Sequence, residues 1–222
     1  SLEKAALIAY NHAQEFNKSY DLYTRLEQAA DTEESRFEAQ LGGMRSAYRI
    51  GNSQAVYALA NKVSSNPKAT EQQRATANFY IGKIAFDRSD FTASLAALNE
   101  TIRLSDNEQT AEARYLRAYI YYQRRDLNKA KELTLAANRE SSGYPYWVAK
   151  CVILLSDIFV EQGDLYNGRA ALEALLENYK EDQALIAEAR QKLSRVNGMI
   201  NQGSRLDNSD PNQLQFEGGG GN

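Results

Sequence analysis

The chain has 222 residues, of which 43% are hydrophobic and 25% charged, an ordinary composition for a folded globular protein. Its net charge of −3 and pI of about 5.4 exclude the strongly basic surface that a nucleic-acid-binding protein needs. No apolar run approaches the roughly 18 residues of a membrane span, and a single cysteine, Cys151, excludes both an internal disulfide framework and a cysteine-based zinc site.

The first predicted element, residues 2–30, is rich in aromatic residues, and a three-residue turn pattern recurs after it. The four copies are Gly51-Asn52-Ser53, Ser89-Asp90-Phe91, Arg125-Asp126-Leu127 and Gly163-Asp164-Leu165. Their middle residues are 38, 36 and 38 positions apart. An interval in this range is typical of stacked helical hairpins, and no strand-type alternation persists anywhere. We therefore predict an all-α solenoid of at least ten helices in antiparallel pairs, without a sheet.

The pattern is clearest between residues 106 and 138. Residues 111–122 form one helix candidate and residues 127–138 a second, with Asp126 placed to cap the second helix. Gly51 and Gly163 occupy the slot just after the first helix, which often requires positive φ. Ser89 and Arg125 fill the same slot, at a cost of roughly 1 kcal/mol each relative to glycine if their backbone is left-handed. We expect the Asp90, Asp126 and Asp164 turns to be structurally equivalent.

Five repeat units are predicted within one domain of residues 1–200. They lie near residues 1–36, 37–74, 75–110, 111–148 and 149–181, and a final helix at 182–200 caps the array. Residues 201–222 are polar and rich in glycine, which predicts a flexible tail. Leu214 and Phe216 are hydrophobic residues in it, and a short docking peptide is the alternative interpretation.

These units resemble the tetratricopeptide repeat (TPR) family. The matching residues are Ile81-Gly82, Asp90-Phe91, Ser94 and Leu98 in the third unit, Ala118, Tyr121, Asp126-Leu127, Ala130 and Ala137 in the fourth, and Ser156, Phe159, Gly163-Asp164-Leu165, Gly168 and Leu172 in the fifth. Arg114 and Arg117 depart from the pattern, because the family usually has apolar residues there. The resemblance implies a right-handed superhelical solenoid of about five hairpins plus a capping helix. It also implies a non-enzymatic scaffold that binds a protein or peptide.

The segment Leu175-Leu176-Glu177-Asn178-Tyr179 is similar to the end of a second helix in bacterial cell-envelope members of the family, of the type found in Bacteroidetes. This similarity implies a periplasmic or cell-envelope location, as part of a larger envelope-associated protein. The alternative location is the cytoplasm. The identity of the partner and the oligomeric state remain open at this point.

In the family, the first helix of each hairpin lines the inner groove, and the corresponding residues here are the predicted binding surface. They are Arg45, Tyr48, Arg49, Phe79, Lys83, Phe86, Tyr115, Tyr119 and Tyr122, followed by Ile153, Asp157 and Val160 in the fifth unit. The spacing i, i+4, i+7 places each set on one helical stripe, and tyrosine and arginine are enriched at binding hot spots. Alternatively, the three tyrosines of the fourth unit belong to the core in a shifted register.

The cationic residues predict the chemistry of the partner. We expect Arg45, Arg49 and Lys83 to be exposed, close together and facing aromatic residues of the next hairpin, which favours an acidic or carboxylate-bearing peptide. The carboxylate clamp of chaperone-binding members is not supported, because Leu41, Phe79 and Tyr115 occupy one of its face positions.

Residues suited to catalysis or metal binding are scarce. His12 is the only histidine, and no cluster of cysteine, histidine and carboxylate residues is evident, so we expect no catalytic residue, no metal and no cofactor. Cys151 is predicted to be a small buried hydrophobe.

Two other functions compete with protein binding. A structural spacer would keep its inner face polar. A carbohydrate-binding repeat domain is suggested by Tyr144-Pro145-Tyr146-Trp147, and an exposed Trp147 beside a pocket would favour it, whereas a buried Trp147 would argue against it.

Overall fold

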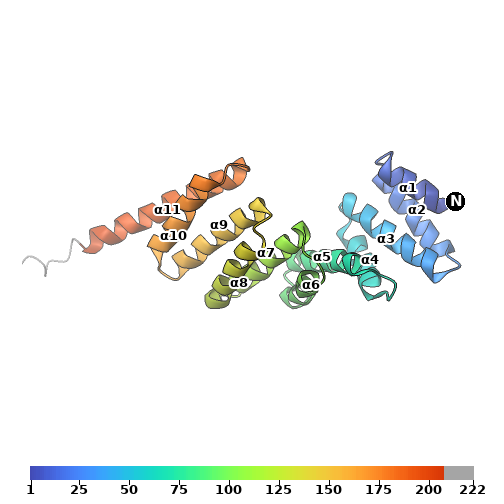
Figure 1. The fold of residues 1–222 in the computed structure, drawn as a ribbon, viewed down its shortest axis with the longest axis horizontal. Coiled ribbons are helices and arrows are strands. Elements are labelled where there is room, and N and C mark those ends of the chain that lie inside the picture. Colours follow the sequence, from blue (N-terminus) through green and yellow to red (C-terminus); the bar gives the residue numbers. More distant parts are fainter. Residues whose placement is uncertain (208–222) are drawn as a thin grey trace, which may run out of the picture. The chain divides into compact units, whose positions relative to one another are not determined.

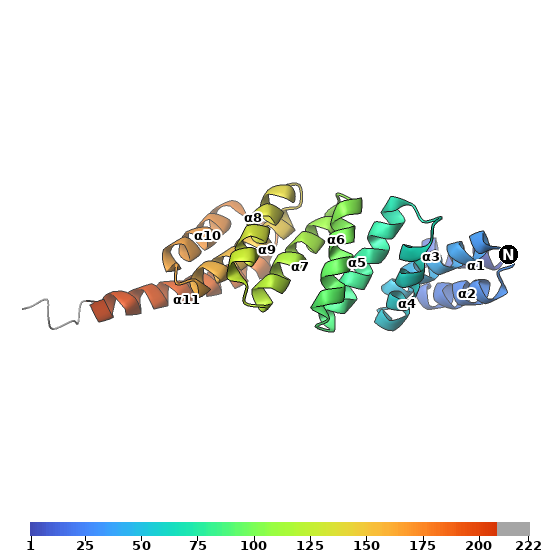
Figure 2. The same cartoon turned by 90° about the horizontal axis from the view of Figure 1, so that it is seen from below.

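The computed structural model describes residues 1–207, and this part of the chain contains eleven helices and no strand. The prediction of at least ten helices without a sheet is confirmed for these residues. Figures 1 and 2 show consecutive helices running back and forth as hairpins. The helices are α1 (Leu2–Asn11), α2 (Phe16–Ala29), α3 (Glu33–Arg49), α4 (Ser53–Ser65), α5 (Glu71–Asp87), α6 (Phe91–Leu104), α7 (Glu108–Gln123), α8 (Leu127–Glu140), α9 (Pro145–Glu161), α10 (Leu165–Asn178) and α11 (Gln183–Asp207). The predicted docking residues of the tail, Leu214 and Phe216, lie outside the described residues.

The chain divides into two compact parts, and the division falls within α7. The N-terminal part comprises residues 1–120 and the C-terminal part begins at residue 121. In the N-terminal part each helix from α1 to α5 packs against the next, up to α6. In the C-terminal part α8 packs on α9, α9 on α10 and α10 on α11. Each part buries a core of its own, which includes Met44, Phe79 and Leu98 in the first and Ile153 and Leu172 in the second.

The four recurring turns share one geometry. Gly51, Ser89, Arg125 and Gly163 have φ of 74°, 60°, 63° and 80°, and the amide of the next residue donates to the carbonyl five positions earlier over 2.8–3.1 Å. This is the Schellman arrangement that ends a helix. The residue that follows then caps the next helix: the side chains of Asn52, Asp90, Asp126 and Asp164 each accept from the amide three positions on. The predicted equivalence of the aspartate turns is confirmed.

The first helices begin three or four residues earlier than the apolar stripes indicated. Thr32 and Thr70 cap α3 and α5, and Gln73 completes a capping box with Thr70. The polar first turns that follow contain no apolar residue that would reveal them in a hydrophobic pattern. At the other end of the chain, α11 continues to Asp207, beyond the predicted end at residue 200.

Small residues let the two helices of a hairpin approach closely. In the α5–α6 hairpin the Ser94 hydroxyl donates to the Gly82 carbonyl over 2.8 Å. In the α9–α10 hairpin the roles are exchanged, and the Ser156 hydroxyl donates to the Gly168 carbonyl over 2.8 Å. A Cβ added to Gly82 would lie 2.8 Å from the Leu98 side chain, so the packing at this crossing requires glycine.

Candidate interaction surface

Positions on the first helices can be compared by counting back from the capping residues Asn52, Asp90 and Asp164. Eleven positions back, the side chains are buried: Leu41, Phe79 and Ile153 are 4%, 2% and 3% exposed. The prediction that Phe79 lines the binding surface is therefore wrong. Its ring belongs to the core of the N-terminal part, because this edge of the stripe packs against neighbouring helices.

Seven positions back, the side chains reach the surface. Arg45 is exposed, and Lys83 and Asp157 are half-buried at the equivalent places. Tyr48 and Arg49 lie four and three positions before the capping residue Asn52, and both are exposed as predicted. Arg45, Tyr48 and Arg49 therefore reach the surface, as a binding role would require, whereas Phe79 belongs to the core.

A stacked pair of tyrosines forms the centre of this surface in the N-terminal part. The rings of Tyr48 on α3 and Tyr80 on α5 lie 4.4 Å apart at 22°. Tyr48 is 44% exposed and Tyr80 only 8%, so Tyr80 provides the base on which Tyr48 rests. Burial and the neighbouring Tyr48 raise the pKa of Tyr80 to about 12, which keeps its phenol protonated at neutral pH.

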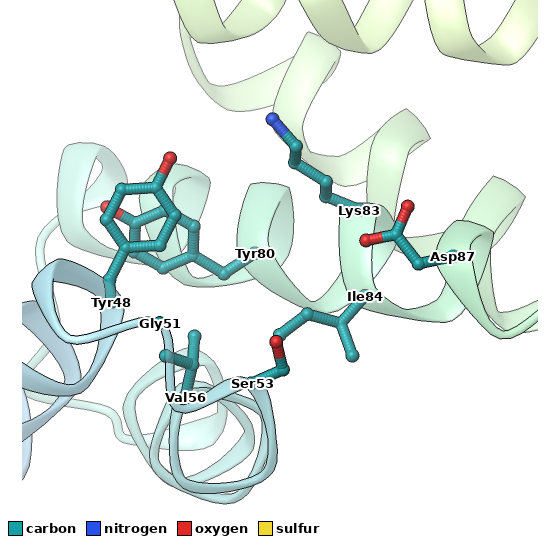
Figure 3. A pocket seen from close by; sticks show the side chains of 8 residues that line it. All are labelled: Tyr48, Gly51, Ser53, Val56, Tyr80, Lys83, Ile84 and Asp87. Atoms are coloured by element: carbon teal, nitrogen blue, oxygen red, sulfur yellow. The ribbon is translucent and has the colours of Figure 1, made fainter.

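Tyr80 lines two cavities. The first has a volume of about 110 Å³ and is lined by Tyr48, Val56, Tyr80, Ile84 and Asp87, among others. Figure 3 shows the two tyrosine rings lying over one another on one side of this cavity and Asp87 on the other. The second has a volume of about 250 Å³. It is lined by Tyr10, Leu41, Met44, Arg45, Gln72, Gln73, Thr76 and Tyr80.

The cations of this surface have different partners. The Lys83 ammonium donates to Glu112 over 2.6 Å and lies 5.6 Å from the Phe79 ring. Burial works against the charge of Lys83, but Glu112 outweighs it, and the pKa of Lys83 lies above its ordinary value. The Arg49 guanidinium lies 4.1 Å from the ring of Phe16, which belongs to the preceding hairpin and not to the next one. Arg45 faces Tyr80 of the next hairpin across the second cavity, as predicted.

Three of the predicted aromatic residues pack against one another. Phe86 lies 5.9 Å from Tyr119, and Tyr119 lies 5.9 Å from Tyr115 in a stacked arrangement. All three are half-buried, and Phe86 and Tyr115 pack against the core. The alternative interpretation therefore holds for Tyr115, which belongs largely to the packing between helices. Phe86 and Tyr119 form the flank of the surface and not an open groove.

In the C-terminal part the equivalent face is built from charges. The Tyr122 hydroxyl donates to Glu161 over 2.5 Å, and Arg125 forms an ion pair with the same carboxylate. Lys192 on α11 donates to both oxygens of Asp157, over 2.7 and 2.8 Å. A cavity of about 120 Å³ lies between these groups, with Val160, Val196 and Met199 among its apolar lining.

The pKa values of two groups on this charged face, Asp157 and Tyr122, are raised. Burial raises the pKa of Asp157, and Lys192 opposes that effect without cancelling it. Burial and the hydrogen bond to Glu161 raise the pKa of Tyr122 well above its ordinary value. Tyr122 is therefore a neutral hydrogen-bond donor in a network, and its ring is half-buried.

The sequence predictions missed several residues of these faces. Tyr10 and Tyr80 were not named, although both line cavities in the N-terminal part. Glu161 and Lys192 were not named in the C-terminal part. Tyr80 directly follows Phe79, and a shift of the stripe by one residue would have found it.

Residues suited to metal binding do not cluster among residues 1–207. No group of three or more histidine, cysteine, aspartate or glutamate residues in this part of the chain is arranged to hold a metal ion. Cys151 is buried, and burial raises the pKa of its thiol to about 12. None of the helices in the described range combines the length and apolar character needed to cross a bilayer.

The aromatic cluster of residues 144–147, which suggested carbohydrate binding, is only partly exposed. Trp147 is half-buried, with its ring 5.0 Å from Tyr146 in an edge-to-face contact, and Tyr146 is exposed. Trp147 is thus neither the exposed platform nor the fully buried side chain that would have decided the carbohydrate hypothesis.

Comparison with known proteins finds a likeness of fold alone. No protein-family model matches the chain, and no curated protein matches it. The structure is similar to that of a thermophilic TPR protein of Thermus thermophilus, with a TM-score of 0.49 and 16% identity, over 86% of this chain and 98% of that chain. The recurring turns, the aspartate caps and the small residues where the helices cross are seen in this chain's own structure and do not depend on that likeness.

Proposed function

We propose that this chain is a non-enzymatic protein-interaction scaffold, and that its N-terminal part binds a peptide segment on the face formed by Arg45, Tyr48 and Tyr80. The observation that carries the proposal is the pair of cavities that Tyr80 lines, with the exposed Tyr48 ring over one and the Arg45 guanidinium beside the other. Aromatic and arginine side chains around small apolar cavities are typical of binding hot spots.

The partner that fits this face carries an apolar anchor next to a carboxylate. The two cavities have the size of single side chains and mixed walls, whose apolar members include Leu41, Met44, Val56 and Ile84. Arg45 has a planar guanidinium suited to two parallel hydrogen bonds with a carboxylate. Lys83 is held by Glu112, so the main electrostatic attraction comes from Arg45 and Arg49. Such binding is modest in affinity and weakens as salt screens the charges.

A structural spacer is less well supported, because the face contains an exposed aromatic ring and apolar cavities where a spacer would be polar. The similarity of residues 175–179 to bacterial envelope proteins supports a location in the cell envelope as part of our proposal. Fractionation of the native cells with an antibody against residues 1–207 tests that location separately.

The test is capture of partners from a native cell-envelope extract, followed by mass spectrometry and by peptide arrays of the captured proteins. The double variant Arg45→Glu/Tyr48→Ala should lose at least about tenfold in affinity for the mapped peptides. Its melting temperature should fall only modestly, because Arg45 is exposed and the loss of the Tyr48 stacking on Tyr80 costs about 0.5–1.5 kcal/mol.

The matched control is Arg25→Glu, an exposed arginine on α2 that lines neither cavity. This control should bind like the wild type. Equal binding by the double variant and the control would overturn the proposal, as would mapped peptides that lack acidic residues.

A further inference from the structure

A wide apolar groove lies in the C-terminal part, on the side of the second helices. Its walls come from α8 and α10 and its floor from α9, and its volume is about 600 Å³. The apolar side chains that line it include Leu135, Val148, Val152, Leu155, Ala171 and Ala174. Leu135 and Ala174 are exposed, and the residues of α9 are half-buried. Figures 1 and 2 show α8, α9 and α10, which contact one another in sequence order.

The groove is long enough for two turns of a helix. Its lining on α9 extends from Pro145 to Leu155, which corresponds to roughly 15 Å at the helical rise. Side chains at i, i+3 or i+4, and i+7 of an amphipathic helix span about 10 Å, which fits within this length, and grooves between helices commonly bind such segments. The volume also lies within the range typical of small-ligand pockets, about 300–1,000 Å³.

One end of the groove is negatively charged. Glu181 lines this end and is the one charged residue among the lining residues of the described chain. Glu177, one turn earlier, is also exposed, and α8 and α10 both end here with their negative dipole ends. The positive N-terminal end of α9 and the Lys180 ammonium, which donates to the Leu176 carbonyl at the end of α10, offset these two dipoles. The charge that lines the groove is therefore the Glu181 carboxylate, and neither Lys180 nor Arg139 is among the lining residues.

We propose that this groove docks an amphipathic helical segment of another protein, with aliphatic side chains over α9 and a lysine or arginine beside Glu181. The apolar lining supplies the affinity and the carboxylate fixes the direction of the bound helix. This surface is chemically opposite to the arginine-bearing face of the N-terminal part, so the two would select different partners.

A second copy of the chain is the competing occupant. Lys4, Leu7 and Ile8 lie on one stripe of α1, and Leu7 and Ile8 are 43% and 57% exposed. This stripe has the composition that the groove would accept. Sedimentation velocity over a range of concentrations, with the variant Ile8→Glu as comparison, distinguishes the two occupants.

The test uses two labelled synthetic helical peptides of about 14 residues and fluorescence anisotropy with the full chain. Both carry leucines at helical spacing; one ends in lysine and the other in glutamate. We expect the lysine peptide to bind about tenfold more tightly. Ala174→Glu should abolish binding of both peptides, and Glu181→Lys should reverse their order. Glu173→Lys, an equal charge change on an exposed residue of α10 outside the lining, should leave the order unchanged.

Several results would overturn the inference. These are binding of neither peptide at about 1 mM, equal affinities for the two, or an unchanged order with Glu181→Lys. Self-association that Ile8→Glu removes would assign the groove to a second copy instead. Circular dichroism and thermal melting check that the Ala174→Glu variant still folds. The reversal expected for Glu181→Lys tests the inference independently of that variant.

Discussion

The two parts of the molecule use the same position of the first helix with opposite charge. Seven residues before the capping residue, the N-terminal part has Lys83, which pairs with Glu112 on α7. The C-terminal part has Asp157 at the equivalent place, and it pairs with Lys192 on α11. The hairpin therefore fixes where a side chain reaches the surface, whereas its chemistry is free to vary.

The surroundings of the two pairs also differ. Tyr10, Tyr48 and Tyr80 form apolar cavities in the N-terminal part, while the C-terminal part links Tyr122, Glu161 and Arg125 by hydrogen bonds and an ion pair. Partners hold the charges of the second surface, whereas Arg45 and the Tyr48 ring are exposed on the first. This difference is why we assign peptide binding to the N-terminal face and not to its counterpart.

The largest expected effects concern the close helix crossings that both parts share. A Cβ on Gly42 would lie 2.2 Å from Cζ of the Tyr23 ring, and one on Gly82 would lie 2.8 Å from the Leu98 side chain. The equivalent distance at Gly168 is 3.0 Å, to Val160. Overpacking of this kind costs about 1–3 kcal/mol, so we expect stability to fall most for Gly42→Ala, then Gly82→Ala, and least for Gly168→Ala.

Urea denaturation measures these differences. Gly198→Ala on α11 is the control, because a Cβ there meets nothing within 4 Å. It should stabilise the protein by up to about 1 kcal/mol through helix propensity. A Gly42→Ala variant as stable as this control would show that the crossing of α2 and α3 is looser than its geometry indicates.

The ion pairs should contribute unequally to stability. Lys83→Met leaves the Glu112 carboxylate, whose side chain is 17% exposed, without its cation, and it should cost about 1 kcal/mol. Lys192→Met leaves the half-buried Asp157 without its closest cation, and it should cost about 1–3 kcal/mol at neutral pH. Asp157→Asn should cost less than Lys192→Met, because it removes the buried charge itself.

The dependence of stability on pH provides the check. Because the pKa of Asp157 is raised in the folded state, the folded protein binds more protons than the unfolded chain between the two pKa values. The stability contributed by this group therefore increases as pH falls through the folded-state pKa. Lys192→Met raises that pKa further, so its deficit should shrink between about pH 7 and pH 4. A deficit that is constant with pH would assign the loss to packing of the lysine stem.

The sequence predicts the fold well because its determinants are local. Each turn is determined by two adjacent residues: one with positive φ that ends a helix, followed by an aspartate or asparagine that caps the next helix. The polar first turns of α3 and α5 were the exception, since Thr32 and Thr70 cap helices that begin without an apolar residue.

The candidate surface was predicted less completely because it depends on neighbours distant in the sequence. Phe79 and Tyr80 are adjacent aromatic residues about 100° apart around α5, and which one is buried depends on the packing of other helices. The partners Asp157 and Lys192 are 35 residues apart, and α11 lacks the turn pattern that would place Lys192 in register. Exposed side chains such as Arg45 and Arg49 were easier to place, because their charge keeps them at the surface.

The smallest effects should distinguish the two turns that lack glycine. Ser89 and Arg125 have φ of 60° and 63°, a backbone conformation that costs a residue with a Cβ roughly 1 kcal/mol relative to glycine. Ser89→Gly should therefore stabilise the protein by about 0.5–1 kcal/mol, because the exposed serine side chain makes no compensating contact that would be lost. Arg125→Gly should gain less, because it also removes the ion pair with Glu161. Thermal melting compares the two variants with Gly163→Ala, which should lose about as much as Ser89→Gly gains. If Arg125→Gly gains as much as Ser89→Gly, the pair with Glu161 contributes nothing to stability, and the charged face of the C-terminal part rests on the Asp157–Lys192 pair and the Tyr122–Glu161 hydrogen bond.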